Sequence, residues 1–204
     1  MFNGNLAVLG TAALFMALSS MQLWGSTPTE PPDTYEVNYF LGLHAPSSSG
    51  NDATITILNP GTNGSGNLCA DIYVLNPSEE LEACCGCLLS ADEIFSGSVV
   101  SNLLSNNVSP ITLANGVIKI ISSTPAGGVC NAAKPTPTAA MRAWLTRLDS
   151  TGTSSGVTTT PFAAATLSSA EQSSLSTRCG DIQLVGSTFG ICICPAEPNN
   201  AVGP

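Results

Sequence analysis

The chain has 204 residues, of which 9% carry a charge, and its 14 acidic and 5 basic side chains give a formal net charge of −9. An average soluble protein has roughly 25% charged residues, and Ser and Thr take much of their place here. The acidic balance excludes nucleic acid as an expected partner, because phosphate binding needs clustered Lys and Arg.

The charge is unevenly placed along the chain. Residues 1–118 carry 10 acids and no bases, whereas residues 119–204 carry 4 acids and 5 bases. When charges are few, chance alone is enough to distribute them unevenly. The alternative interpretation is an acidic surface on one copy that contacts a near-neutral surface on the next copy, head to tail. In that case Lys119, Arg142 and Arg147 are the side chains expected to stabilise the contact.

The chain begins with an apolar run. Leu6–Trp24 contains no charged residue and is followed by Gly25 and Ser26, which is typical of a secretory signal peptide over residues 1–26. About 20 apolar residues also suffice to span a bilayer, so a retained hydrophobic helix is the alternative. If uncleaved, residues 6–24 are the expected contact with a membrane. Both interpretations predict an extracellular or cell-surface protein.

The rest of the chain divides into a spacer, a domain and a tail. Residues 27–34 are rich in Pro and predict an extended spacer. Residues 35–195 predict one β-sandwich domain, because about 200 residues have room for a single core. Residues 196–204 predict a flexible tail.

From Tyr35 onward the sequence predicts β-strands. Ala53–Leu58 alternates with a period of two, and Leu68–Leu75 follows a turn-rich loop as the returning strand of a hairpin. The Gly, Ser and Thr of 151–160 predict an exposed loop. Short strands between Gly, Pro and Asn turns indicate an all-β sandwich, Ig-like or jelly-roll-like. The remaining strand candidates are Tyr35–Leu41, Cys84–Leu89, Val99–Leu104, Gly116–Ser122, Ala139–Leu148 and Thr188–Cys194.

Two short helices are predicted from capping-box spacing. Ser90 precedes Glu93 by three positions, and Ser168 precedes Glu171 by the same distance. In the second helix Leu175 and Cys179 share one face, and Gly180 predicts the end of the helix. Cys179 is then placed to join the helix to the sheet.

The cysteines predict up to four disulfide bonds. An even number of cysteines in a chain with few charges indicates an oxidising compartment, and their pairing cannot be read from the sequence. Cys84 and Cys85 are adjacent, so in an extended segment they point to opposite faces and bond different partners. A metal site is the alternative, but neither cysteine cluster has the C-x₂₋₄-C spacing of zinc ligands, and no metal ligand is predicted. The disulfide candidates are Cys69, Cys84, Cys85, Cys87, Cys130, Cys179, Cys192 and Cys194.

No catalytic motif is evident. His44 is the single histidine and is expected in a loop. Glu79, Glu80 and Glu82 follow a turn, and they predict a solvated acidic turn rather than the paired carboxylates of a glycosidase or a calcium site. No nucleophile elbow, zinc-protease, P-loop or dinucleotide motif occurs. The sequence therefore predicts a protein that is not an enzyme and has no cofactor.

Five stretches, taken in order, resemble a known group of proteins. They are Leu68–Pro77, Glu79–Ser90, Gly116–Ser123, Met141–Thr146 and Leu167–Gly180. This order is similar to that of a group of secreted, cysteine-rich proteins abundant in acidobacterial genomes, whose specific parts are Cys-Cys-x-Cys-Leu and Arg-Ala/Gly-Trp. The resemblance covers roughly Ala53 to Cys194. It implies export, a disulfide-linked β domain and an extracellular or envelope role, and it carries no catalytic residues.

The first functional hypothesis is a structural subunit of an extracellular filament or surface matrix, with copies of itself as partners. Tyr35–Leu43 precedes the core and is expected to add to the open sheet edge of a neighbouring copy. Such a protein has few charged side chains at its sheet edges to oppose pairing with another strand, which favours pairing between the edges of two copies. The candidate residues of this assembly strand are Tyr35, Val37, Tyr39 and Leu41.

The second hypothesis is a secreted binding or adhesion module for carbohydrate or surface ligands. Its basis is the sandwich class and a small set of aromatic residues that would form a stacking face. Aromatic residues make up 5% of the chain, which is few for a sugar-binding protein. The candidates are Tyr35, Tyr39, Tyr73 and Trp144.

Overall fold

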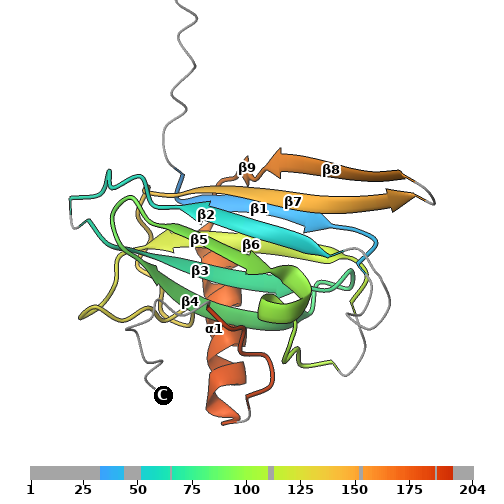
Figure 1. Cartoon of the computed structure of the whole chain (residues 1–204). Coiled ribbons are helices and arrows are strands. Elements are labelled where there is room, and N and C mark those ends of the chain that lie inside the picture. Colours follow the sequence, from blue (N-terminus) through green and yellow to red (C-terminus); the bar gives the residue numbers. More distant parts are fainter. Residues whose placement is uncertain are drawn as a thin grey trace, which may run out of the picture. The chain divides into compact units, whose positions relative to one another are not determined.

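The computed structural model describes residues 33–43, 52–64, 66–109, 113–151, 154–186 and 188–194. These residues form two antiparallel sheets, a turn of π-helix and one α-helix (Figure 1). The predicted signal peptide or retained helix, most of the predicted spacer, His44 and the predicted tail lie outside the described residues. None of the described helices is long and apolar enough to span a membrane.

The first sheet contains five antiparallel strands in the order β4-β3-β6-β1-β9. The second sheet contains four antiparallel strands in the order β5-β2-β7-β8. The predicted disulfide-linked β-sandwich class is confirmed. The strands are β1 (Tyr35–Phe40), β2 (Ala53–Leu58), β3 (Leu68–Leu75), β4 (Leu81–Leu89), β5 (Ile94–Ser98), β6 (Gly116–Ser123), β7 (Arg142–Thr151), β8 (Ser154–Pro161) and β9 (Ala163–Ala164).

The main core lies between the two sheets. The alternation in β2 turns Ile55 and Ile57 inward, and they belong to one buried cluster with Ile72 of β3 and Ile118 of β6. β3 is buried along its whole length, because its other face is also covered. That face forms a second core with the helix α1 (Ser169–Leu184), as the position of α1 against the first sheet shows (Figure 1).

The chain connects the two sheets along both sides of the sandwich. On one side, β4 continues into β5 through a turn at residues 90–93. On the other side, β8 continues into β9 through Phe162, which is buried in the main core. We call these the β4–β5 side and the β8–β9 side.

The helix predicted at Ser90 is wrong, although its capping contact forms. The Ser90 N–H donates to a Glu93 carboxylate oxygen at 2.6 Å, but Asp92 has a φ of 63°. A left-handed residue ends a helix at once, so the contact closes a turn before β5. The strand predicted at Val99–Leu104 is also wrong, because Val99–Leu103 forms the π-helical turn η1, capped by Ser98.

Four other predicted elements differ from the structure in their bounds or in their type. The α1 helix continues past Gly180 to Leu184. The first glycine after the helix is Gly186, which has a left-handed φ of 65°. The predicted loop at 151–160 forms most of β8, and the strand predicted at 139–148 is shifted to β7. Thr188–Cys194 is not a full strand, since Ile191 alone forms a β-bridge, with Cys84.

Candidate assembly interface

The predicted assembly strand pairs with a strand of its own chain. β1 is antiparallel to β6 from Tyr35, opposite Ile121, to Phe40, opposite Gly116. On its other side only Glu36 and Val37 pair with the short strand β9. β1 is therefore fully paired along one edge and largely unpaired along the other within the described residues.

Tyr35 attaches the start of β1 to α1. Its ring is 5% exposed and packs in the second core, with Val37 against the same cluster. Its hydroxyl donates to Glu171 Oε1 at 3.2 Å, and Lys119 Nζ donates to the same oxygen at 2.6 Å. Burial and then the Glu171 carboxylate raise the pKa of Tyr35. Burial is the largest single effect and opposes ionisation of Glu171, but the hydrogen bond and charge of Lys119, the Tyr35 hydrogen bond and the Arg178 charge together leave the pKa of Glu171 below its usual value.

The other two candidates of the assembly strand are exposed. Tyr39 is 52% exposed, and the guanidinium carbon of Arg147 lies 5.1 Å from its ring centroid. Leu41 lies beyond the end of β1 and is 54% exposed. Sequence reasoning missed Phe40, which is fully buried in the main core. The signal was present, because Phe40 is the largest apolar residue on the opposite face of the same strand.

Gly116 makes room for Phe40 at the end of β1. A Cβ atom at Gly116 would lie 2.5 Å from Phe40 Cζ and 2.5 Å from the carbonyl oxygen of Leu75. Neither backbone nor a buried ring can yield at that distance. The docking position of β1 thus depends on a glycine in the neighbouring strand.

All eight predicted cysteines form disulfide bonds. Cys84 and Cys85 point to different partners, as their adjacency predicts, with Cys84 bonded to α1 and Cys85 to the C-terminal segment. Every bond joins a cysteine of β3 or β4 to a cysteine that follows β6, so no disulfide has an end in β1. The pairs are Cys69–Cys130, Cys84–Cys179, Cys85–Cys192 and Cys87–Cys194.

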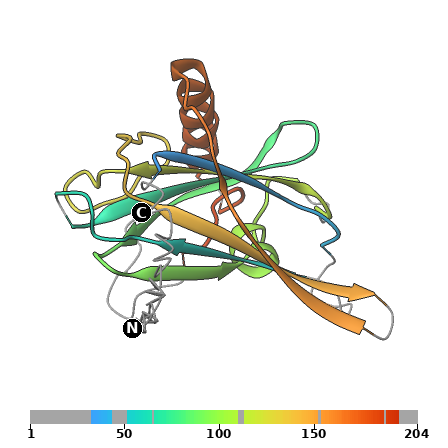
Figure 2. The ribbon, with the colours of Figure 1, turned by 90° about the horizontal axis from the view of Figure 1, so that it is seen from above.

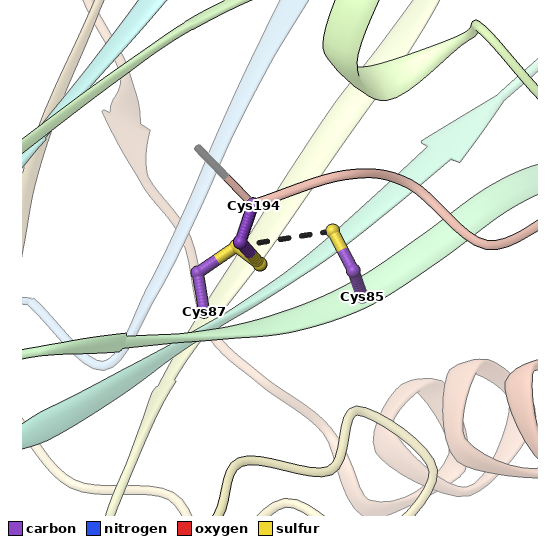
Figure 3. Close-up of side chains that lie close together, drawn as sticks. All are labelled: Cys85, Cys87 and Cys194. Atoms are coloured by element: carbon purple, nitrogen blue, oxygen red, sulfur yellow. Dashed lines mark hydrogen bonds between the residues drawn. A yellow bond between two sulfur atoms is a disulfide. The ribbon is translucent and has the colours of Figure 1, made fainter. Parts of the chain in front are cut away.

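The Sγ atoms of Cys85, Cys87 and Cys194 lie as close together as the ligands of a metal site, but they belong to two disulfide bonds. The three Sγ atoms lie within 4.8 Å of one another, and Figure 3 shows Cys87 bonded to Cys194 with Cys85 beside them. Cys85 is bonded to Cys192. Metal binding by cysteine requires a thiolate, which a disulfide sulfur does not provide.

The C-terminal segment 188–194 covers the β4–β5 side. The Cys84 N–H donates to the Gly190 carbonyl at 2.8 Å, and the Cys192 N–H donates to the Cys84 carbonyl at 3.2 Å. The Ile193 N–H reaches the Asn102 carbonyl of η1 at 2.8 Å. Two disulfides fix this segment to β4, so the outer edge of β4 is covered by a covalently held strip of chain.

The β8–β9 side has no such cover in the described part of the chain. β8 pairs with β7 over its whole length, whereas β2 pairs with β7 only as far as Arg147. The end of the β7–β8 hairpin therefore extends past β2 as a two-stranded ribbon (Figure 2). The sequence of β8, SSGVTTTP, carries no charge. Its C-terminal end is tied back by bonds of 3.2 and 3.3 Å from the Asn38 amide to Thr160 Oγ1 and the Pro161 carbonyl.

The acidic turn is only partly solvated. Glu79 and Glu80 are exposed, as expected. Glu82 is 2% exposed, and it accepts hydrogen bonds from Asn76 Nδ2 at 2.8 Å and from the Ser109 N–H at 2.9 Å. Its carboxylate fixes the loop after η1 to the start of β4 and is a structural group.

The four aromatic candidates do not form one face. Tyr73 is fully buried and donates to the Ala132 carbonyl at 2.6 Å, and Tyr35 is buried beside α1. Neither ring is accessible to a sugar. Trp144 is half-buried on the second sheet, and Tyr39 is exposed at the end of the first sheet.

Sequence reasoning gave no structural role to a buried carboxylate in β3. Asp71 has no exposed surface, and its Oδ2 accepts a hydrogen bond from Ser123 Oγ at 2.5 Å. Its Oδ1 lacks a hydrogen-bond partner among the described residues. Burial raises the pKa of Asp71 to about 7, against the opposing effect of the Ser123 hydrogen bond. The signal was an acidic residue inside the otherwise apolar strand LCADIYVL.

Comparisons with known proteins add no assignment. No protein-family model matches the chain, and no curated protein matches it. One solved structure is similar, the crystal structure of Thermotoga maritima 1070, with a TM-score of 0.44 and 10% identity over 66% of this chain and 96% of that chain. Likeness at this level carries no argument about function.

Proposed function

We propose that the protein is a non-catalytic extracellular structural subunit, whose copies join into a filament or surface matrix by exchanging the N-terminal strand β1. The observation that carries the proposal is that β1 belongs to both cores but is held by no disulfide. Four disulfides are typical of proteins in oxidising compartments, which supports export.

The contacts of β1 suit exchange between copies. A β1 strand from a neighbouring copy would form the same backbone ladder with β6. It would place Tyr35 against α1 on one face and Phe40 in the main core on the other. This is strand addition, in which backbone hydrogen bonds give affinity and alternate side chains fill pockets. Each copy gives one strand and receives one, so the contact is head to tail, and it extends into a filament when the rotation between copies does not close a ring.

The proposal is tested by electron microscopy of the purified protein with a synthetic peptide of Tyr35–Leu43. We expect filaments that become shorter as the peptide is added, because the peptide occupies the place of β1 and ends growth. The matched control is the same peptide with Tyr35→Asp and Phe40→Asp, which cannot enter either core. Uniform monomers at high protein concentration would contradict the proposal.

A further inference from the structure

The outer edge of β8 presents a defined row of backbone groups. The Phe162 N–H donates to the Ala143 carbonyl at 2.9 Å, which fixes the phase of the ladder with β7. Antiparallel strands alternate between bonded and non-bonded pairs. Thr160 and Thr158 therefore face β7, whereas Ser155, Val157 and Thr159 direct both N–H and C=O away from it. None of these three has a strand partner on that side in the described ranges.

From this edge we infer a second contact between copies: β8 pairs antiparallel with β8 of another copy, with Val157 on the two-fold axis. In that register Ser155 lies opposite Thr159 of the partner, and Val157 lies opposite itself. Every outward N–H then meets an outward carbonyl. Moving the axis to Thr159 would set Pro161, which has no N–H, opposite Val157 and lose a bond.

The absence of charge in β8 indicates that the partner of this edge is a second copy of the chain. A chain with a net charge of −9 repels itself, so two identical surfaces approach each other at a lower electrostatic cost where they are neutral. β8 has no charged residue, and two β8 strands meet without like charges opposite each other. Natural edge strands are usually guarded by Lys or other charges, and this one is not.

The pairing also stabilises the ribbon that carries it. Residues 148–151 have β8 as their only strand neighbour in the described chain, and isolated two-stranded ribbons are marginal in water. Pairing two copies places four strands side by side at this point. Val157, 68% exposed in one copy, would contact the Val157 of the other. The second sheets of the two copies become one continuous sheet.

This contact is separate from β1 exchange. It uses the opposite sheet and is isologous, so alone it gives dimers, whereas β1 exchange alone gives linear polymers. Both together join filaments side by side. The β8 contact is therefore tested while β1 exchange is blocked.

The first test is Val157→Pro, studied by sedimentation velocity with excess β1 peptide present to block exchange. Proline removes an outward N–H, and an edge strand tolerates it because the bonds to β7 remain. We expect dimers of the unaltered chain and at least tenfold weaker association of the variant, with unchanged circular dichroism. Val157→Thr is the matched control and should dimerise normally. Monomers of the unaltered chain at millimolar concentration would overturn the inference and leave β1 exchange intact.

The second test fixes the register by disulfide cross-linking of added cysteines. Bonded antiparallel pairs have Cα atoms about 5.5 Å apart, within the range of a disulfide. Val157→Cys should therefore give a covalent dimer on non-reducing gels. Thr159→Cys places its two copies about 13 Å apart along the strands and should give none. Equal cross-linking of both variants, or none with either, would overturn the proposed register.

Discussion

Asp71 lies in the middle of β3 beneath the loop closed by the Cys69–Cys130 disulfide. Gly86 is opposite it in β4, and a Cβ there would lie 2.8 Å from Asp71 Oδ1 and 2.9 Å from Cys130 Cβ. The carboxyl group thus lies between the Gly86 backbone, the Cys130 side chain and Ser123, with no surface exposed to solvent. An ionised carboxylate in such a place lacks solvation, which favours its protonated form.

The pH dependence of stability follows from this burial. The folded pKa of Asp71, about 7, lies above its usual value of 3.8. The folded state therefore binds the proton more tightly, and the free energy of unfolding falls as the pH rises from about 4 to about 7, by roughly 4 kcal/mol. Asp71→Asn should raise the thermal midpoint at pH 8 and change it little at pH 4. Asp92→Asn, in an exposed turn, is the control in calorimetry. An equal effect of Asp71→Asn at both pH values would contradict this account.

At the scale of elements, α1 is attached to the sheet by few contacts. Only Leu175 and Cys179 of its residues are buried, and Glu171 bonds Tyr35 and Lys119 near its start. A helix with so narrow an apolar face gains little from packing. The Cys84–Cys179 bond is accordingly the main restraint on the helix.

Removing that bond should loosen α1 selectively. We expect Cys84→Ala with Cys179→Ala to cost about 2–4 kcal/mol and to abolish amide-exchange protection in Ser169–Leu184, while the two sheets stay protected. The matched control removes Cys69 and Cys130, which should expose the loop after β6 and leave α1 protected. Loss of protection throughout both sheets in the first variant would show that α1 is needed for the whole fold.

The strands with a strong apolar pattern could be predicted from the sequence, and those without it could not. Ala53–Leu58 alternates because one face meets the core. β8 is built from Ser, Gly and Thr, so its strand form depends on pairing with β7, which is a tertiary effect. The capping contact between Ser90 and Glu93 does form, but it closes a turn and does not begin a helix. The disulfide pairing depended on how the sheets bring distant residues together.

The parts of the candidate interface likewise divide into those with an apolar sequence pattern and those without one. Tyr35 and Val37 were recognised because apolar residues alternate in that segment, and they do pack on one face. The open edge of β8 was not recognised, because an edge is defined by which strands are absent beside it. Its lack of charge is visible in the sequence, but its Ser, Gly and Thr content predicts a loop.

At the scale of the whole molecule, acidic and basic residues that are far apart in the sequence come near one another. Acidic turns at residues 79–80 and 92–93 lie at the two ends of β4. In the backbone pairing, however, Asp33 forms a β-bridge with Met141, which precedes Arg142, and Asp52 precedes Ala53, which pairs with Arg147. Lys119 is already paired with Glu171, and Arg147 lies over Tyr39. Lys119 and Arg147, both expected in a head-to-tail contact, are thus engaged within the chain.

Salt dependence distinguishes the two kinds of contact between copies. Raising NaCl from about 20 to about 300 mM shortens the range of charge repulsion, so pairing through the neutral β8 edges should become stronger, by several-fold in the dimerisation constant. A contact based on matched charges should become weaker over the same range. Sedimentation equilibrium in the presence of the β1 peptide measures this constant. Weaker association at high salt would favour charge matching.

The two neighbouring disulfides between β4 and the C-terminal segment limit how far the chain can extend under tension. A force applied between Tyr35 and Cys194 passes along the backbone to Cys87 and then crosses directly to Cys194. Only about 50 residues, or roughly 170 Å of contour, can then unravel, compared with roughly 540 Å for the uncrosslinked chain. A subunit pulled between these two points would stretch by a fixed short increment and retain a covalently closed remainder.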